Sequence, residues 1–306
     1  MLRFEPMQRI FVTGGTGFVG KHVIRALLAH GFLVRCLVRP GSEEDLRGFE
    51  AIDRVPGDAL DTRELAPSVE GCAAIVHLVG IIREQPMRGV TFDRLHREAT
   101  AQMVDVARRA GVKRFVHMSA LGTRADARSG YNRSKWAAEE AVRDSGLDWT
   151  ILRPSVIYGR GDEFVSVFAG MIRRLPVVPV IGSGQYPLQP IAVEHVAEGF
   201  ARSLLAGVHT HQVYELGGPH AYPFVEILDL IGQALGHAKV RKVHAPLGAV
   251  RLMTKALQWL PAYPVSSDQL LMLEEGNITD PRRFYADFAL EPEPLDGGLA
   301  RMLAPA

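Results

Sequence analysis

The stretch IFVTGGTGFVG, from Ile10 to Gly20, decides the fold of this chain. Four residues with strand-forming side chains run into a cluster of glycines, and an amphipathic stretch from Gly17 to His30 follows. Gly14, Gly17 and Gly20 are spaced three residues apart. This pattern predicts a strand, a tight turn and a helix whose first backbone amides are left without partners.

The same glycines indicate a binding site for the pyrophosphate of a dinucleotide. Side chains in the turn would block the phosphates, and the helix N-terminus offers free N–H groups and the positive end of its dipole. Gly20 would let the helix pack closely on the strand. The spacing is GxxGxxG and not the common GxGxxG, and a plain strand-to-helix turn is the alternative interpretation. We expect dinucleotide binding, with Thr16, Phe18 and Val19 beside the cofactor.

The rest of the first half alternates between short apolar runs and longer amphipathic ones. Strands are expected at 33–38, 51–55, 74–79, 114–118 and 148–153, and helices at 61–69, 92–110 and 131–144. This alternation predicts an α/β fold, namely a Rossmann-type, doubly wound parallel sheet with helices on both faces. Ligands of such sheets bind beyond the carboxyl ends of the strands.

The second half has less regular patterning. Helices are expected at 163–174, 194–205, 224–235, 247–259 and 267–274, and a strand at 213–216 should extend the sheet. We expect residues 1–160 to form the dinucleotide-binding Rossmann core. Residues 161–306 should form a smaller, mixed C-terminal substrate lobe, from which 191–219 return to the core.

The end of the second strand bears on the choice between NADP and NAD. A NAD site usually has Asp or Glu about 20 residues after the glycines, where it binds the ribose 2′-hydroxyl. Here Arg39 occupies that place, with Arg35 four residues before it. A guanidinium can fork onto a 2′-phosphate. We therefore expect NADP(H), with NAD as the alternative cofactor; a surface arginine without a ligand is the other interpretation.

Two more strand ends carry candidate cofactor contacts. Asp58, followed by Ala59, could accept a hydrogen bond from the adenine amino group, or it could cap a short helix that begins near Asp61. Leu78, Val79 and Gly80 follow the fourth strand and could offer backbone contacts along the cofactor.

Ser119, Tyr131 and Lys135 form a candidate catalytic set. Ser119 ends the fifth strand, and the spacing of four places Tyr131 and Lys135 on one face of the next helix. A free tyrosine has a pKa of about 10, so a nearby ammonium would be needed to make it a base at neutral pH. Tyr131 could then act as general acid or base, with Ser119 orienting the substrate oxygen and Lys135 binding the nicotinamide ribose.

These motifs resemble the short-chain dehydrogenase/reductase superfamily, in its extended or atypical branch, the NAD-dependent epimerase/dehydratase family. The resemblance is carried by TGGTGFVG (13–20), the Ser–Tyr–Lys set and LRPSVIYG (152–159), and it extends over nearly the whole chain. It implies that Pro154 and Ile157 contact the cofactor. The branch usually has Asp where this chain has His195, so a contact at that helix start differs.

Within this branch, the chain resembles bacterial proteins similar to the 39-kDa NADPH-binding accessory subunit of respiratory complex I. Arg39, WTILRP (149–154) and SDQLLML (267–273) carry this likeness. It leaves turnover open, because that subunit is thought to use its nucleotide structurally. The sequence thus favours an NADP(H)-dependent oxidoreductase or epimerase-type enzyme, and the alternative is a non-catalytic accessory or assembly subunit.

Composition excludes several other classes of function. The net charge of +1 gives no global field that would recruit nucleic acid. Cys36 and Cys72 form no CxxC or zinc spacing and suit a reducing compartment, and the 11 histidines show no ligand set, so no metal is expected. No secretory signal or membrane-spanning run is evident. We expect a cytoplasmic protein, with a peripheral position at the inner membrane as an alternative.

The apolar stretch LGAVRLMTKALQW, residues 247–259, has two interpretations. It could pack on the substrate lobe, or it could face lipid or a partner, with Arg251 and Lys255 at its edge. The second interpretation would suit a quinone-like or otherwise apolar small-molecule substrate, or a membrane-complex partner.

Overall fold

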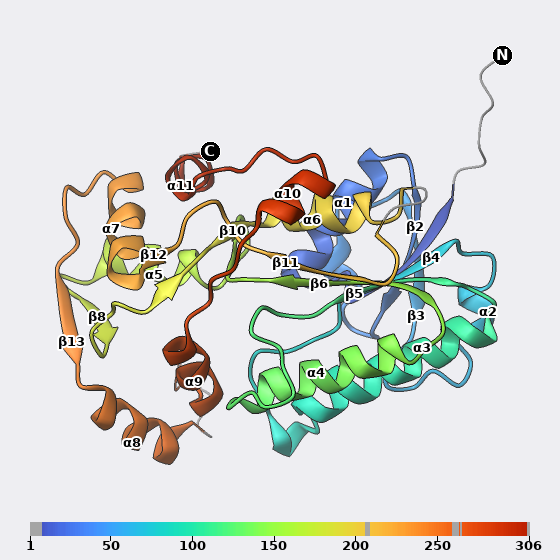
Figure 1. Ribbon diagram of the computed structural model, residues 1–306, viewed down its shortest axis with the longest axis horizontal. Coiled ribbons are helices and arrows are strands. Elements are labelled where there is room, and N and C mark those ends of the chain that lie inside the picture. Colours follow the sequence, from blue (N-terminus) through green and yellow to red (C-terminus); the bar gives the residue numbers. More distant parts are fainter. Residues whose placement is uncertain (1–7, 206–208, 259–262, 264, 305–306) are drawn as a thin grey trace.

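In the computed structural model, residues 8–205, 209–258, 263 and 265–304 are described. A seven-stranded parallel sheet in the order β11-β6-β5-β4-β1-β2-β3 forms the centre of the fold (Figure 1). Its strands are β1 (Arg9–Thr13), β2 (Leu33–Val38), β3 (Ile52–Pro56), β4 (Ala74–His77), β5 (Arg114–Met118), β6 (Asp148–Pro154) and β11 (Gln212–Leu216). The strand order reverses between β1 and β4, where doubly wound sheets bind their ligands.

Helices cover both faces of this sheet (Figure 1). The first face carries α1 (Phe18–Ala29), α6 (Val193–Arg202) and α10 (Arg282–Asp287). The second carries α2 (Ala66–Val69), α3 (Ala99–Arg109) and α4 (Gly130–Arg143). The α/β, Rossmann-type doubly wound fold expected from the sequence is therefore confirmed.

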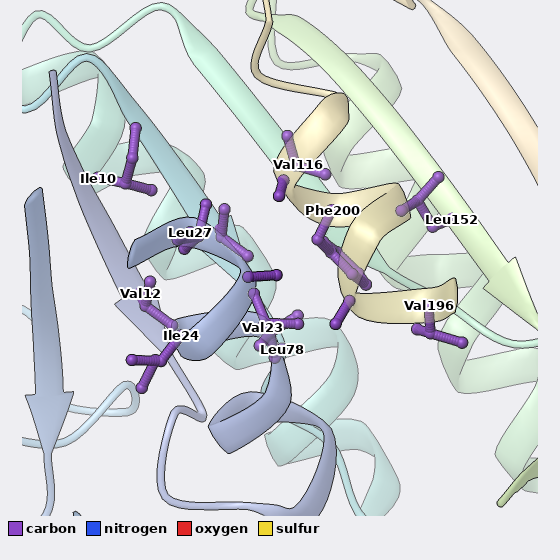
Figure 2. Packing of buried hydrophobic residues seen from close by; sticks show 14 of the residues in the cluster. Ile10, Val12, Val23, Ile24, Leu27, Leu78, Val116, Leu152, Val196 and Phe200 are labelled. Carbon is purple, nitrogen blue, oxygen red and sulfur yellow. The ribbon is translucent and has the colours of Figure 1, made fainter. Parts of the chain in front are cut away.

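Alternating side chains of the strands supply the two cores. Ile10 and Val12 of β1 pack against α1, whereas Phe11 between them belongs to the core under α3. Figure 2 shows α1 and α6 side by side over the sheet, with Leu27 and Phe200 among the side chains between them. Strands that are covered on both faces in this way read as continuous apolar runs, as β1 and β4 do.

Two expected helices differ in the structure. The region 61–69 is helical only in its last turn, α2, with Pro67 in the first turn of that helix. The region 92–110 begins with a π-helical turn, Asp93–Glu98, before α3 continues as an ordinary α-helix. Short 3-10 turns at Glu43–Leu46 and Pro86–Arg88 were not expected from the sequence.

The C-terminal region builds a third core beside the strand ends. It contains α5 (Val165–Arg174), β8 (Val178–Ile181), α7 (Phe224–Ala234), β13 (Lys242–Ala245) and α11 (Leu295–Leu303), with α8 (Leu247–Leu257) and α9 (Ser267–Glu275) at its edge (Figure 1). Three two-stranded ladders brace it: β8 with β13, β7 (Ile157–Tyr158) with β10 (Ile191–Ala192), and β9 (Pro187–Leu188) with β12 (Tyr222–Pro223). The sequence did not predict β8, β13, α10 or α11.

The second half also returns to the Rossmann sheet. Strand β11 pairs with β6, and α6 packs on α1. The proposed division at residue 160 stays a prediction, and Trp259, the expected end of α8, lies outside the described residues. Within the described ranges, no helix combines the length and apolar character that crossing a bilayer requires.

Candidate nucleotide-binding and catalytic site

The turn after β1 is shaped by two glycines that cannot carry side chains. Gly14 has a φ of +74°, and a methyl group there would lie 2.9 Å from the carbonyl carbon of Leu78. A methyl group on Gly20 would lie 2.2 Å from the carbonyl oxygen of Gly14. The turn therefore passes directly against the end of β4, and α1 packs directly against the turn.

Gly17 leaves the N-terminus of α1 open. It is exposed, its backbone is extended (φ −75°, ψ 172°), and a methyl group there would come no closer than 3.4 Å to the carbonyl oxygen of Gly14. Helix α1 has no side-chain cap and no acidic residue in its first turn. Among the described residues, the amides of residues 18–20 have no hydrogen-bond acceptor. Free donors, space and the helix dipole together fit the pyrophosphate of a dinucleotide.

The other residues expected in this turn are placed around it. Thr16, Phe18 and Val19 are half-buried. The Phe18 ring meets the edge of His22, with centroids 5.6 Å apart. The sequence pattern did not identify Gly15, which is also required: a methyl group there would lie 2.4 Å from the Cys36 sulfur. Burial raises the pKa of the Cys36 thiol to about 12, so this cysteine is a packing residue.

The ends of β2 and β3 hold the residues expected near the adenosine. Arg39 is exposed just after β2. Arg35 is engaged elsewhere, because its Nη1 donates to the Ser68 carbonyl at 2.7 Å. Asp58 accepts a hydrogen bond from the Leu60 amide at 2.9 Å, beside the buried Ala59. Since the nearest helix starts at residue 66, the alternative that Asp58 caps a helix near residue 61 is wrong; its adenine contact stays a prediction.

The segment after β4 lies between the glycine turn and Lys135 of α4. Leu78 is buried, and its amide donates to the Thr13 carbonyl at 3.0 Å. Val79 is half-buried, and its amide nitrogen would lie 3.0 Å from a methyl group on Gly14. A methyl group on Gly80 would lie 2.9 Å from Lys135 Nζ. A cofactor extending along residues 78–80 would thus pass from the open end of α1 to the lysine.

Ser119, Tyr131 and Lys135 come from the end of β5 and the first turns of α4. Lys135 is buried, and its Nζ donates to the carbonyl of Met118 at 3.1 Å, one residue before Ser119. Ser119 is buried, and its hydroxyl donates to Thr123 Oγ1 at 3.3 Å. Tyr131 is half-buried on α4, one turn before Lys135. The backbone thus places the three residues at neighbouring ends of β5 and α4, as the sequence analysis expected; their catalytic roles stay predictions.

Burial governs the electrostatics of this set. It raises the pKa of Tyr131 to about 12, so the phenol keeps its proton at neutral pH. It lowers the pKa of Lys135 to about 8, an effect that the nearby Glu139 carboxylate opposes. Glu139 is fully buried and is held by Arg143 and Arg153 at 2.6 Å and 2.7 Å. The expected lowering of the Tyr131 pKa by the Lys135 ammonium is therefore not found, because burial alone shifts it. A phenol that keeps its proton is suited to donate that proton to an oxygen that gains negative charge.

His96 holds the site together, and the sequence analysis missed it. Its Nδ1 hydrogen-bonds the Ser134 hydroxyl on α4 at 2.7 Å, and its Nε2 lies 3.0 Å from the Ile81 carbonyl. Its ring also meets the edge of the Tyr131 ring, with centroids 5.2 Å apart. Burial lowers the pKa of His96 to about 2, so it stays neutral. The π-helical turn that aims this side chain leaves no trace in the apolar periodicity.

A row of polar side chains lies under the site within the sheet. Thr13 Oγ1 bonds His77 Nδ1 at 2.7 Å, and His77 Nε2 bonds Thr100 Oγ1 at 3.2 Å. His117 stacks on His77, with ring centroids 5.6 Å apart. His117 is buried, and neither of its ring nitrogens has a hydrogen-bond partner among the described residues. Burial lowers the pKa of both histidines, so they are neutral.

The C-terminal region contacts the site through α9. Asp268, in the first turn of α9, accepts hydrogen bonds from the amides of Gly130 at 2.5 Å and Tyr131 at 3.4 Å. This carboxylate therefore supplements the cap that Ser129 gives to α4, where the Asn132 amide donates at 3.1 Å. The start of α4 is thus held by a residue from a distant part of the chain.

Pro154 ends β6, and Ile157 begins β7 three residues later. Pro154 is buried, and its carbonyl accepts from the Leu121 amide at 2.9 Å. Ile157 is half-buried and pairs with Ile191. His195 lies against Tyr285, with Nδ1 3.4 Å from its hydroxyl. Within the described residues, no group of three or more His, Cys, Asp or Glu side chains could hold a metal ion.

Comparison with known proteins agrees with this geometry. Residues 14–165 match the family model described as NAD(P)H-binding. The chain is 26% identical over 296 residues to NADH dehydrogenase [ubiquinone] 1 alpha subcomplex subunit 9 of Arabidopsis thaliana, covering 93% of this chain and 73% of that one. It is 32% identical over 193 residues to a ceramide reductase of Caulobacter vibrioides, covering 63% of this chain.

The fold also matches a solved epimerase over nearly its whole length. A UDP-glucose 4-epimerase of Thermotoga maritima superimposes with a TM-score of 0.75 and 20% identity, covering 97% of each chain. The chain therefore has the NAD(P)H-binding fold of the extended short-chain dehydrogenases/reductases. Its match spans 59% of the ceramide reductase, and it is distantly homologous to the complex I subunit.

Proposed function

We propose that this protein is an NADP(H)-dependent reductase that uses Ser119, Tyr131 and Lys135 to reduce a carbonyl group on an apolar, lipid-like substrate. The observation that carries the proposal is the position of Lys135. Its buried Nζ lies against Gly80 after β4 and bonds the Met118 carbonyl at the end of β5. A cation there stands at the strand ends where the nicotinamide half of a cofactor would lie.

Each part of the site has a role in this reaction. The amides at the start of α1 bind the pyrophosphate, and Arg39 binds the 2′-phosphate. NADPH, when bound, supplies the hydride that reduces the carbonyl carbon. Tyr131 donates its proton to the carbonyl oxygen, which leaves an alcohol. Lys135 stabilises the phenolate that results, and Ser119 orients the oxygen by a hydrogen bond.

An apolar substrate is favoured by two observations. The ceramide reductase to which the chain is similar is named for a lipid. The loop after β4, which leads from Gly80 toward α3, also exposes apolar side chains: Ile82 is 50% exposed and Met87 is 99% exposed. Exposed apolar side chains near a site suit a substrate with long hydrocarbon chains.

The test is whether the protein reduces a long-chain keto-ceramide with NADPH. The reaction is measured from the loss of the nucleotide's absorbance and from analysis of the product. Tyr131→Phe should lower kcat at least about 100-fold and leave the Kd for NADPH nearly unchanged. Tyr222→Phe, at a half-buried tyrosine of the C-terminal region, is the matched control and should keep full activity. Full turnover by Tyr131→Phe would refute the proposed role of the phenol.

A second candidate is a non-catalytic NADPH-binding accessory or assembly subunit. It is favoured by the relation to the mitochondrial NADH dehydrogenase subunit, which covers 93% of this chain. In that case the protein would retain NADPH that never turns over and would co-purify with a membrane complex. Rapid exchange of the nucleotide together with turnover of a defined carbonyl substrate would refute it.

A further inference from the structure

Residues 230–267 differ in charge from the rest of the chain. Asp and Glu make up 34 of 306 residues, or one in nine, yet none occurs between Asp229 and Asp268. The same stretch has five cationic side chains: Lys239, Arg241, Lys242, Arg251 and Lys255. A stretch of this length would hold about four acidic residues at the average frequency, so this segment is basic although the whole chain is nearly neutral.

This segment forms an apolar surface as well as a basic one. Helix α8 has the sequence LGAVRLMTKAL, and Thr254 is its one buried residue. Leu252 is 73% exposed and Met253 is 53% exposed; on the neighbouring strand β13, Val243 is 53% exposed. Figure 1 shows β13 and α8 at the end of the molecule far from β3. We call α8 and β13 together the α8–β13 face.

Several cations of this face, and of the residues just before β13, are available to a ligand. Lys242 is paired with Asp229 at 2.5 Å, and Arg251 is paired with Glu274. Lys239, Arg241 and Lys255 are exposed, and none of them has an acidic partner among the described residues. Residues 237–242 also line an open depression of about 650 Å³. Apolar side chains beside unpaired cations complement an anionic phospholipid surface.

We propose that the α8–β13 face docks on an anionic phospholipid bilayer. Leu252 and Met253 enter the boundary between headgroups and acyl chains, while Lys239, Arg241 and Lys255 contact the lipid phosphates. An amphipathic element of this kind lies in the plane of the interface and does not cross the bilayer. The docking itself does not depend on the proposed reaction.

The docking face is connected to the candidate catalytic site. Helix α8 packs on α9, whose Asp268 bonds the amides of Gly130 and Tyr131. Gln258, just after α8, accepts a hydrogen bond from Arg83 Nη2 at 2.7 Å, and Arg83 lies in the loop after Gly80. Helix α9 therefore lies between α8 and Tyr131, so a lipid that left the bilayer at α8 would have only this helix to pass before it reached the candidate site.

The experiment is flotation of the full chain with vesicles of phosphatidylcholine alone and of phosphatidylcholine mixed with phosphatidylglycerol. The wild type should bind the anionic vesicles and lose binding as salt is raised. Leu252→Glu should weaken binding at least about tenfold, whereas Leu205→Glu, at a leucine after α6 that is 46% exposed, should not. The double variant Lys239→Glu/Lys255→Glu should weaken it about 30-fold or more, whereas Arg47→Glu/Lys113→Glu on the Rossmann core should not.

Several outcomes would overturn this proposal. Absence of binding to the anionic vesicles would do so, and so would an equal loss of binding in the control variants. If Leu252→Glu instead converts a dimer into a monomer, the face is an interface between copies of this chain. Binding of NADPH by each variant shows that it is folded. Tyr131→Phe should dock like the wild type, so failure of docking and failure of the proposed reaction are distinguishable.

Discussion

Gly17→Ala should separate nucleotide binding from folding. The φ of −75° at Gly17 suits alanine, the residue is exposed, and the nearest atom to an added methyl group is 3.4 Å away. Replacing the glycine at the helix N-cap destabilises the protein, whereas alanine lowers the entropy of the unfolded chain and so stabilises it. The unfolding free energy of the nucleotide-free protein should therefore change by no more than about 1 kcal/mol. The methyl group would, however, occupy the space in front of the free amides of α1.

The linkage between NADPH binding and folding gives the expected rise in thermal stability. NADPH at 100 times its Kd should stabilise the wild type by about 2.7 kcal/mol. An unfolding entropy of about 2.1 cal/mol/K per residue gives about 0.6 kcal/mol/K for 306 residues, so Tm should rise by about 4 °C. Gly17→Ala should show a nucleotide-free Tm within about 2 °C of the wild type and no rise with NADPH.

Gly20→Ala is the contrasting variant, and both are measured by thermal unfolding and titration calorimetry. The added methyl group would lie 2.2 Å from the Gly14 carbonyl oxygen. The unfolding free energy of this variant should therefore fall by about 1–3 kcal/mol, and its Tm by about 2–5 °C, without any nucleotide present. Wild-type affinity for NADPH in Gly17→Ala, or an unchanged Tm in Gly20→Ala, would refute the reasoning about this turn.

Four other variants test the rest of the site. Arg39→Ala should raise the Kd for NADPH at least about tenfold and leave that for NADH unchanged, as measured by calorimetry; equal effects on both would remove the case for a 2′-phosphate contact. Lys135 has a pKa of about 8, below its usual 10.5, so the unfolded chain binds more protons between these values. Unfolding free energy from urea titrations should therefore rise with pH above 8, by up to about 1.4 kcal/mol per pH unit, and Lys135→Met should abolish that rise; an identical pH dependence in both proteins would contradict the burial of this charge. His96→Ala should cost about 1–3 kcal/mol and lower kcat, and Ser134→Ala, which removes one of its contacts, should cost less; equal losses would show that the bond to Ile81 contributes nothing.

The parts of the fold that the sequence predicted are those set by local patterns. The expected strands 33–38 and 114–118 have the observed bounds, because short apolar runs between turns determine them. Gly14 and Gly20 could be identified from the sequence because the atoms that exclude a side chain there are nearby: the Gly14 carbonyl oxygen for Gly20, and the end of the adjacent strand β4 for Gly14. Lys135 could be placed one turn after Tyr131 because the spacing of four is a property of any helix.

The parts that were missed depend on contacts between distant segments. Gly15 is needed because the Cys36 sulfur occupies the space beside it, and nothing near Gly15 in the sequence reveals this. Strands β8 and β13 pair across more than 60 residues, and neither is a continuous apolar run, because β8 contains Pro179 and β13 contains Lys242 and His244. Asp268 reaches the amides of α4 only because α9 folds back from the far end of the chain.

The motif identified Tyr131 and Lys135, but burial determines their protonation states. His77, His96 and His117 lie near Lys135, and burial keeps all three neutral, with the charge of Lys135 itself opposing their protonation. If any of them were charged, the repulsion would lower the pKa of Lys135 further and remove the cation that a phenolate needs. The carboxylate of Glu139 acts in the opposite direction, although Arg143 and Arg153 share its charge. Neutral histidines under the site therefore preserve the charge on Lys135. We expect a polar but uncharged replacement of His117 to be tolerated and a permanent cation there to lower the pKa of Lys135 below about 8.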